Sequence, residues 1–119
     1  MIRVKIKPDI RLDIIHRLPC LACVQEGQSQ PNRTEAHHLV DKGYREHSGG
    51  DEATIPLCGW HHRGEPKKSH SKTEMGFIYG PSLATSKSFF VKRYGTEREL
   101  LARVNDTIGK NMCRGDQRK

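Results

Sequence analysis

Two pairs of potential metal ligands with the same spacing constrain the fold of this chain most strongly. Cys20 and Cys23 form a Cys-x-x-Cys turn, and Cys58 and His61 repeat the spacing later in the chain. Such a turn directs two ligands at one point, and a second pair completes a tetrahedral zinc site. The segment between the pairs is longer than in a zinc finger and leaves room for a hairpin. We therefore expect a structural zinc ion that clamps two halves of a small domain together.

Other interpretations of these ligands remain open. A redox Cys-x-x-Cys motif would be expected near a parallel βαβ pattern, which the sequence does not display. His62 could replace His61 as the fourth zinc ligand, although the knuckle spacing favours His61. Cys113 stands apart near a polar C-terminus and is expected to be a spare thiol.

The length of the chain limits the size of its core. With 119 residues, of which 34% are hydrophobic, it predicts a single domain over 1–119 with a modest core. A metal clamp would stabilise such a domain. We expect the zinc and metal core over about 18–72 and a helical C-terminal part over about 82–110.

The charge of the chain indicates a polyanionic partner. The net charge is +7, and basic residues recur from Arg3 to Lys119 instead of forming one tail. This favours nucleic acid over the alternative of a merely soluble basic protein. The sequence displays neither a signal peptide nor an apolar run long enough for a membrane span. We expect a cytoplasmic protein with no membrane partner, in a compartment where disulfides are rare.

Local patterns predict an α+β arrangement. Residues 2–7 alternate apolar and basic side chains and predict a strand, and a short helix is expected to end before Pro19. Short strands are predicted over 35–40 and 55–57, with loops over 25–33 and 41–53, and a helix is expected to begin near His61. Two C-terminal helices are predicted, one closed by Gly95 and one that starts with a capping box at 96–99 and frays from about Lys110.

Three further histidines exceed what one zinc ion can bind. His37 and His38 are adjacent on the first predicted strand of the hairpin, and His62 follows the second knuckle. Phosphodiester hydrolysis requires a cation that stabilises developing charge and a base that deprotonates water. Neighbouring residues of a strand point to opposite faces, so one histidine could hold metal while the other meets water. The alternative is that the pair extends the zinc shell or faces solvent.

The order of these motifs resembles the HNH endonucleases of the His-Me finger, or ββα-metal, class. The segments that carry the resemblance are EAHHLV and IPLCGWHHRGEP, within about 20–70. The resemblance implies that His37 binds a catalytic Mg²⁺ or Mn²⁺ ion, that His38 is the general base, and that His62 is a second metal ligand. It offers His70 as a further metal ligand.

A narrower resemblance reaches the C-terminal part. The segments PLCGWHHRG, KSHSK and RYGTERELLARVN are similar to the Ref family, phage recombination-enhancement nucleases that cut DNA at a RecA filament. This resemblance implies DNA as substrate, a RecA filament as partner, and the cytoplasm of a bacterial host as location if the chain is phage-encoded.

Two positions bear on how well the sequence fits the HNH pattern. The middle Asn of the signature falls at Ala53-Thr54, where the Thr54 hydroxyl could replace it. Glu35 could bind metal, orient a histidine or be a plain strand-edge carboxylate, and the last is the expectation. Trp60 is expected in the core. Five basic residues flank the expected site and are expected to contact phosphates: Lys42, Arg45, Arg63, Lys67 and Lys68.

The sequence thus predicts a small α+β, zinc-clamped HNH domain with additional C-terminal helices that hydrolyses DNA with a divalent cation. One alternative is a non-catalytic zinc module that binds nucleic acid, which needs neither His37 nor His62. A second is a module that docks on RecA or a phage replication complex.

Overall fold

A short antiparallel sheet organises the protein. The computed structural model describes residues 7–28, 34–40, 49–67 and 69–117. Strands β1 (Glu35–His38) and β2 (Thr54–Leu57) pair so that His37 lies opposite Ile55 and His38 opposite Thr54. All four residues of β2 are buried, whereas those of β1 are partly exposed. The sheet therefore presents the histidine strand at the surface and uses the second strand as core.

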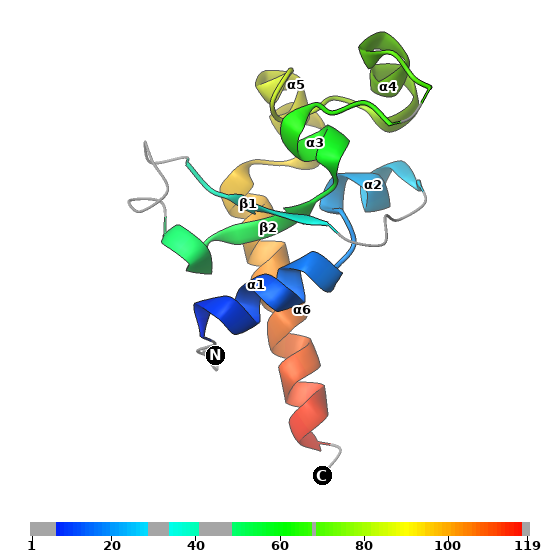
Figure 1. The fold of residues 1–119 in the computed structure, drawn as a ribbon. Helices are drawn as coiled ribbons and strands as arrows, with labels where there is room; N and C mark the ends of the chain where they lie inside the picture. Colours follow the sequence, from blue (N-terminus) through cyan, green and yellow to red (C-terminus); the bar gives the residue numbers. More distant parts are fainter. Residues whose placement is uncertain (1–6, 29–33, 41–48, 68, 118–119) are drawn as a thin grey trace.

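Helices from both ends of the chain pack on this sheet. Helix α1 (Pro8–Arg17) contacts both strands, and α6 (Glu97–Gln117) contacts β2 before it extends away from the rest of the molecule (Figure 1). Pro8 suits the first turn of α1 because its missing N–H has no partner there. The buried core joins these helices to the sheet through Ile15, Leu39, Ile55, Leu100 and Val104, among others.

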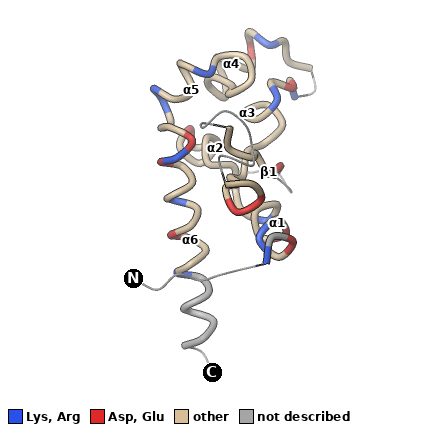
Figure 2. The backbone as a smooth tube through the Cα atoms, turned by 90° about the vertical axis from the view of Figure 1, so that its left-hand side faces the viewer, with Lys and Arg blue, Asp and Glu red and all other residues tan. Residues whose placement is uncertain are grey.

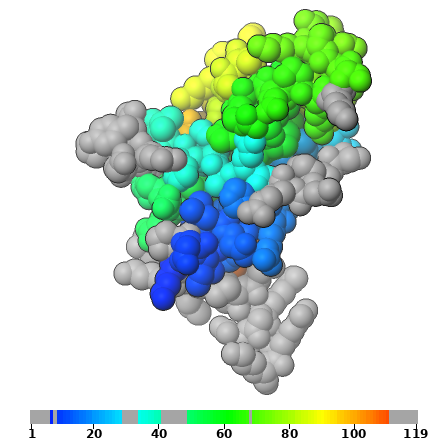
Figure 3. Space-filling view, viewed as in Figure 1, coloured from blue at the N-terminus to red at the C-terminus, as the bar shows by residue number. Residues whose placement is uncertain are grey.

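The remaining helices are short. Helix α2 (Leu21–Glu26) follows α1, the turn η1 (Gly50–Glu52) precedes β2, and α3 (Gly59–Arg63) follows it directly. Helices α4 (Lys72–Tyr79) and α5 (Lys87–Tyr94) then form an upper lobe with α3, above β1 and α1 (Figure 3). None of the described helices combines the length and apolar character that a bilayer crossing requires.

Most predicted elements are present, with several differences. Strand β1 ends at His38, two residues before the predicted end, and η1 lies within the loop predicted over 41–53. The predicted loop over 25–33 is wrong at its start, because α2 continues to Glu26 and ends at Gly27 in the left-handed region (φ 70°). Helix α3 ends at Gly64 (φ 72°), ahead of Pro66. Helices α2 and α4 have no counterpart in the predictions. Helix α6 continues beyond Lys110 to Gln117. The strand predicted over 2–7 lies outside the described residues except for its last position.

Candidate metal centre and histidine cluster

Three thiols and one imidazole converge at the junction of α2 and α3. The ligand atoms of Cys20, Cys23, Cys58 and His61 all lie within 4.8 Å of one another, and all four residues are buried. The shortest separations are 3.2–3.5 Å from sulfur to His61 Nδ1 and 3.7 Å from Cys23 Sγ to Cys58 Sγ. Zinc bonds of ~2.3 Å to sulfur and ~2.0 Å to nitrogen place tetrahedral ligands about 3.5–3.8 Å apart. The cluster therefore has the size and donor set of a structural metal site such as that for zinc.

Local backbone structure builds this cluster. Cys20 is the N-cap of α2, and its sulfur lies 3.5 Å from the backbone nitrogen of Cys23, which donates to it. Cys58 is likewise the N-cap of α3, which places His61 in the same short helix. Each pair of ligands is thus fixed by one helical turn, and the two turns face each other.

A carbonyl group fixes the orientation of the His61 ring. His61 Nε2 lies 2.7 Å from the Tyr79 carbonyl oxygen at the end of α4. A carbonyl oxygen only accepts hydrogen bonds, so Nε2 carries the proton and the Nδ1 lone pair faces the three thiols. Such an outer partner commonly orients metal-bound histidines. Trp60 donates from Nε1 to the Gly80 carbonyl at 2.9 Å and is buried, as expected for a core residue.

His37 and His62 lie side by side outside this cluster. Their ring centroids are 5.0 Å apart, with the planes inclined at 70°. His37 comes from β1 and His62 from α3, and both rings are partly buried. The structure thus separates His61 from His62, sending the first toward the thiols and the second toward His37.

A carboxylate contacts His62 on the side that Nδ1 faces. His62 Nδ1 lies 2.8 Å from Glu35 Oε1, and Arg63 Nε and Nη2 donate to both oxygens of the same carboxylate at 2.6–3.0 Å. The Arg63 hydrogen bonds hold the pKa of Glu35 below its usual value. Burial lowers the pKa of His62, the Glu35 hydrogen bond opposes this, and nearby His37 adds to the lowering, so that the pKa lies below its usual value overall. Glu35 therefore orients a histidine, and the expectation of a plain strand-edge carboxylate is wrong.

A buried carboxylate contacts His37. Glu97, at the start of α6, is 4% exposed, and its Oε2 lies 3.3 Å from His37 Nε2. The same oxygen accepts from the Val40 backbone N–H at 3.2 Å, and Lys87 Nζ lies 3.4 Å from Oε1. Burial alone would raise the pKa of Glu97, but these bonds and charges lower it overall. The sequence does not point to Glu97 as a site residue, because nothing local reveals partners in a distant strand; it lies within the predicted capping box at 96–99, which Thr96 and Glu99 form.

His38 contacts a third carboxylate, on the loop before β2. Its Nε2 lies 2.7 Å from Asp51 Oδ1. Thr54, buried opposite His38, donates from its hydroxyl to the Asp51 carbonyl at 3.1 Å and accepts from Arg11 Nε at 3.0 Å. Thr54 thus ties η1, which carries Asp51, to the start of β2. Asp51 itself was not predicted as part of a site.

The remaining predicted site residues that the structure describes do not join the pair formed by His37 and His62 in one metal-ligand group. His70 precedes α4, and its buried Nδ1 has no hydrogen-bond partner, with Glu74 Oε2 3.9 Å away. Among the described residues, the Cys₃His cluster is the one group of three or more side chains poised to hold a metal. Arg63 also pairs with Glu65, and Lys67 Nζ lies 4.2 Å from the centre of the Tyr79 ring. Lys42, Arg45 and Lys68 lie outside the described residues.

One of three comparisons with known proteins identifies a family for this chain. A family model described as "Recombination enhancement, RecA-dependent nuclease" matches residues 8–108. Neither the curated proteins nor the solved structures gave a match. The matched region takes in both ligand pairs, the sheet, and the histidines with their carboxylates. The chain therefore belongs to the recombination enhancement, RecA-dependent nuclease family.

Proposed function

We propose that the chain is an HNH-type, metal-dependent DNA endonuclease in which β1, β2 and α3 form the ββα-metal unit of a single domain over 1–119. The observation that carries this proposal is the pairing of His37 from β1 with His62 from α3. This pair is a candidate reaction centre in a chain that belongs to a nuclease family, and it lies beside, and separate from, the Cys₃His cluster.

In this proposal the Cys₃His cluster holds a structural zinc ion. All four of its ligands are used, so it has no open position for a substrate. Its task is to join α2 to α3 and thereby fix the strand and helix that carry the histidines. The catalytic ion is a second ion, Mg²⁺ or Mn²⁺.

The orientation of the two rings supports His37 and His62 as ligands of the catalytic ion. Glu97 contacts Nε2 of His37 and Glu35 contacts Nδ1 of His62, so the opposite nitrogen of each ring can bind metal. His70, whose buried Nδ1 lacks a partner, is the candidate third ligand on the family resemblance. Water and phosphate oxygens would complete the coordination, and the ion would stabilise charge on the phosphorane and the leaving oxygen.

His38 is the proposed general base. It would take a proton from the attacking water, and Asp51 would hold the ring and stabilise the imidazolium that forms. Thr54 takes the place of the middle HNH Asn by holding the Asp51 loop. Lys42, Arg45, Arg63, Lys67 and Lys68 would contact DNA phosphates. The proposed partner is DNA in a RecA filament, in the bacterial cytoplasm.

Relaxation of supercoiled plasmid tests this function. Purified protein should nick plasmid when Mg²⁺ or Mn²⁺ is added and should stop when excess EDTA removes it, with RecA filaments as a parallel arm. Brief chelation should leave the more tightly held zinc in place, and elemental analysis checks this. Absence of cleavage with every cation, with and without RecA, would contradict the proposal.

The competing proposal is a non-catalytic zinc module that binds DNA or RecA. It is favoured by the fact that the described residues gather no second group of three metal ligands. This module would never nick DNA, and its binding would be indifferent to substitution of His37, His38 or His62. Salt-sensitive DNA binding would identify it as a DNA-binding module instead of one that docks on RecA alone.

A further inference from the structure

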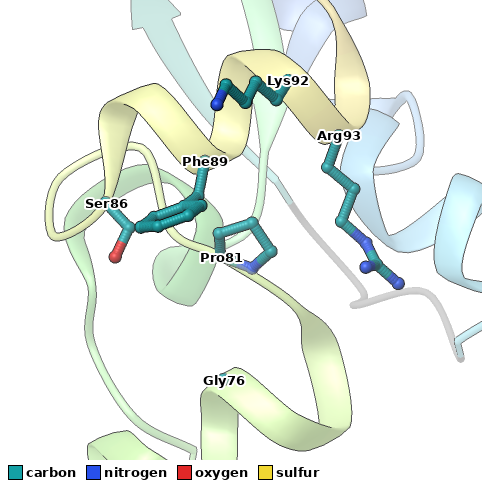
Figure 4. Close-up of a pocket in the computed structure, with 6 residues that line it drawn as sticks. All are labelled: Gly76, Pro81, Ser86, Phe89, Lys92 and Arg93. Atoms are coloured by element: carbon teal, nitrogen blue, oxygen red, sulfur yellow. The ribbon is translucent and has the colours of Figure 1, made fainter.

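A pocket lies between α4 and α5, away from the metal cluster and the histidines. It has a volume of about 530 Å³ and is lined by Gly76, Pro81, Ser86, Phe89, Lys92 and Arg93. The Phe89 ring lies beside Pro81, and Gly76 of α4 lies across from them without a side chain to fill the space (Figure 4). A pocket of this size can hold a flat ring such as a nucleobase.

The core does not need the aromatic side chain at this pocket. Helix α5 buries Phe90 and Tyr94, whereas Phe89 is 66% exposed. On α4, Phe77 follows the pocket residue Gly76 and is 87% exposed. Two phenylalanines exposed to this degree on adjoining helices indicate a binding surface.

The charge beside Phe89 indicates an anionic occupant. Lys92 and Arg93 line the pocket, and no acidic residue does. Glu26, whose side chain is 12% exposed, pairs with Arg93 and offsets part of its charge, whereas Lys92 also lines the pocket.

Aromatic rings beside basic side chains match the chemistry of single-stranded nucleic acid. Exposed bases stack on aromatic side chains while lysine and arginine contact the backbone. A duplex keeps its bases paired and stacked inside, so it could use the lysine but not Phe89. We propose that the α4–α5 pocket binds a single-stranded segment of DNA, with Phe89 stacked on a base and Lys92 at a phosphate. This inference rests on the DNA partner of the proposed function.

Fluorescence anisotropy with labelled oligo(dT) and a labelled duplex tests the pocket. Stacking on one aromatic ring is typically worth ~1–3 kcal/mol, so Phe89→Ala should raise the Kd for oligo(dT) about 5- to 150-fold. The same variant should change the duplex Kd little, and Phe89→Trp should restore binding. Lys92→Gln should weaken the binding of both oligo(dT) and duplex DNA, and the salt dependence of the affinity should fall by about one phosphate contact. Ile10→Ala, an exposed apolar residue on α1, is the matched control and should bind as wild type does.

Three results would overturn the inference. The first is a Kd for oligo(dT) that is unchanged in Phe89→Ala. The second is an equal loss of affinity of this variant for duplex DNA. The third is a loss of self-association in Phe89→Ala, as measured by sedimentation, which would make the pocket a contact between copies of the chain. Plasmid relaxation by the wild type separates this inference from the proposed function. If Phe89→Ala loses oligo(dT) binding but the wild type does not relax plasmid, the pocket is supported and the proposed nuclease function is not. Unchanged binding with an active wild type overturns the pocket alone.

Discussion

Each histidine of the proposed reaction centre is paired with its own carboxylate: His37 with Glu97, His38 with Asp51, and His62 with Glu35. The three acids come from three different elements. Their common effect is to fix ring orientation, which decides the nitrogen that is available for metal or for a proton. In the proposed function, these carboxylates prepare the three rings for their roles.

Replacement of the most buried acid should loosen the metal site. Glu97→Gln keeps an oxygen for the Val40 N–H but removes the charge that orients His37. Loss of such an outer partner typically costs 10–100-fold in metal affinity, so titration calorimetry on zinc-loaded protein should show Mn²⁺ binding weakened by about that factor. Asp106→Asn, an exposed acid paired with Lys110 on the same helix, is the control and should bind Mn²⁺ normally. Wild-type affinity in Glu97→Gln would exclude the positioning role.

The zinc ligands could be predicted from the sequence because their geometry is local. The hydrogen-bond partners of the histidines could not, because they lie far away in the chain. Cys20 with Cys23 and Cys58 with His61 are joined within one turn, so their spacing alone predicts convergence. The spacing favours His61 over His62 as the fourth ligand, but the orientation of the His61 ring depends on the carbonyl of Tyr79, and the role of Glu97 depends on where α6 meets β1. Such contacts are set by tertiary packing, which no spacing within the chain encodes.

At the scale of elements, α2 and α3 are too short to be stable alone. Helices of one or two turns are marginal in water, and the Cys₃His cluster joins these two to each other. Metal binding to such a cluster is coupled to folding because the unfolded chain has no preformed site.

Protein purified without added metal should therefore contain one zinc ion per chain by elemental analysis. Cys58→Ser should lose this zinc and most of its cooperative thermal unfolding, as followed by circular dichroism. Cys113→Ser is the matched control and should keep both. A Cys58→Ser protein that melts like the wild type would show that the cluster is not a structural clamp.

A second tie joins α2 to α5 and should respond to acid. Glu26 accepts from Arg93 and from the Tyr94 hydroxyl, and the Arg93 hydrogen bonds lead in holding the pKa of Glu26 below its usual value. A lowered pKa in the folded state gives stability that is present above the usual glutamate pKa and is lost as pH falls through the folded value. Glu26→Gln should lower the Tm at pH 7 and lower it less at the lowest pH at which elemental analysis still finds the zinc bound. An equal loss at both values would contradict the ion pair as the cause.

Prediction of the elements followed the strength of their local signals. The box at Thr96 and Glu99 forms as predicted, with both reciprocal hydrogen bonds, and opens the longest helix. Ser71 and Glu74 form the same motif at α4, but the helix that follows buries only Met75 and carries Gly76, so no apolar periodicity identified it. Helix α4 owes its place to tertiary contacts such as that of Tyr79 with His61.

For the whole molecule, charge is distributed along the fold instead of on one arm. Lys and Arg occur on α1, α4, α5 and α6, interspersed with acidic residues (Figure 2). With a net charge of +7, binding to DNA should be weak, largely independent of sequence, and steeply reduced by salt as counterions are released. Titrations of duplex DNA at several salt concentrations check this. Binding that is insensitive to salt, or absent at low salt, would contradict it.

The central claim is that this fold positions a general base for phosphodiester hydrolysis. The decisive comparison is the rate of plasmid nicking by the wild type and by His38→Ala, with Mg²⁺ or Mn²⁺ and with and without RecA filaments. Zinc content and circular dichroism of each protein exclude unfolding as the cause of any loss. His16→Asn is the control, since His16 lies outside both sites and Asn keeps a donor for the Thr34 carbonyl.

General-base catalysis typically contributes ~10²–10⁴ in rate, so the folded, zinc-loaded His38→Ala protein should lose nearly all nicking. His62→Ala should also lose nicking, but by weakening the divalent site, so excess cation should restore part of it. His16→Asn should cut at the wild-type rate. A folded, zinc-loaded His38→Ala protein that nicks plasmid as fast as the wild type would contradict the role of His38 as general base.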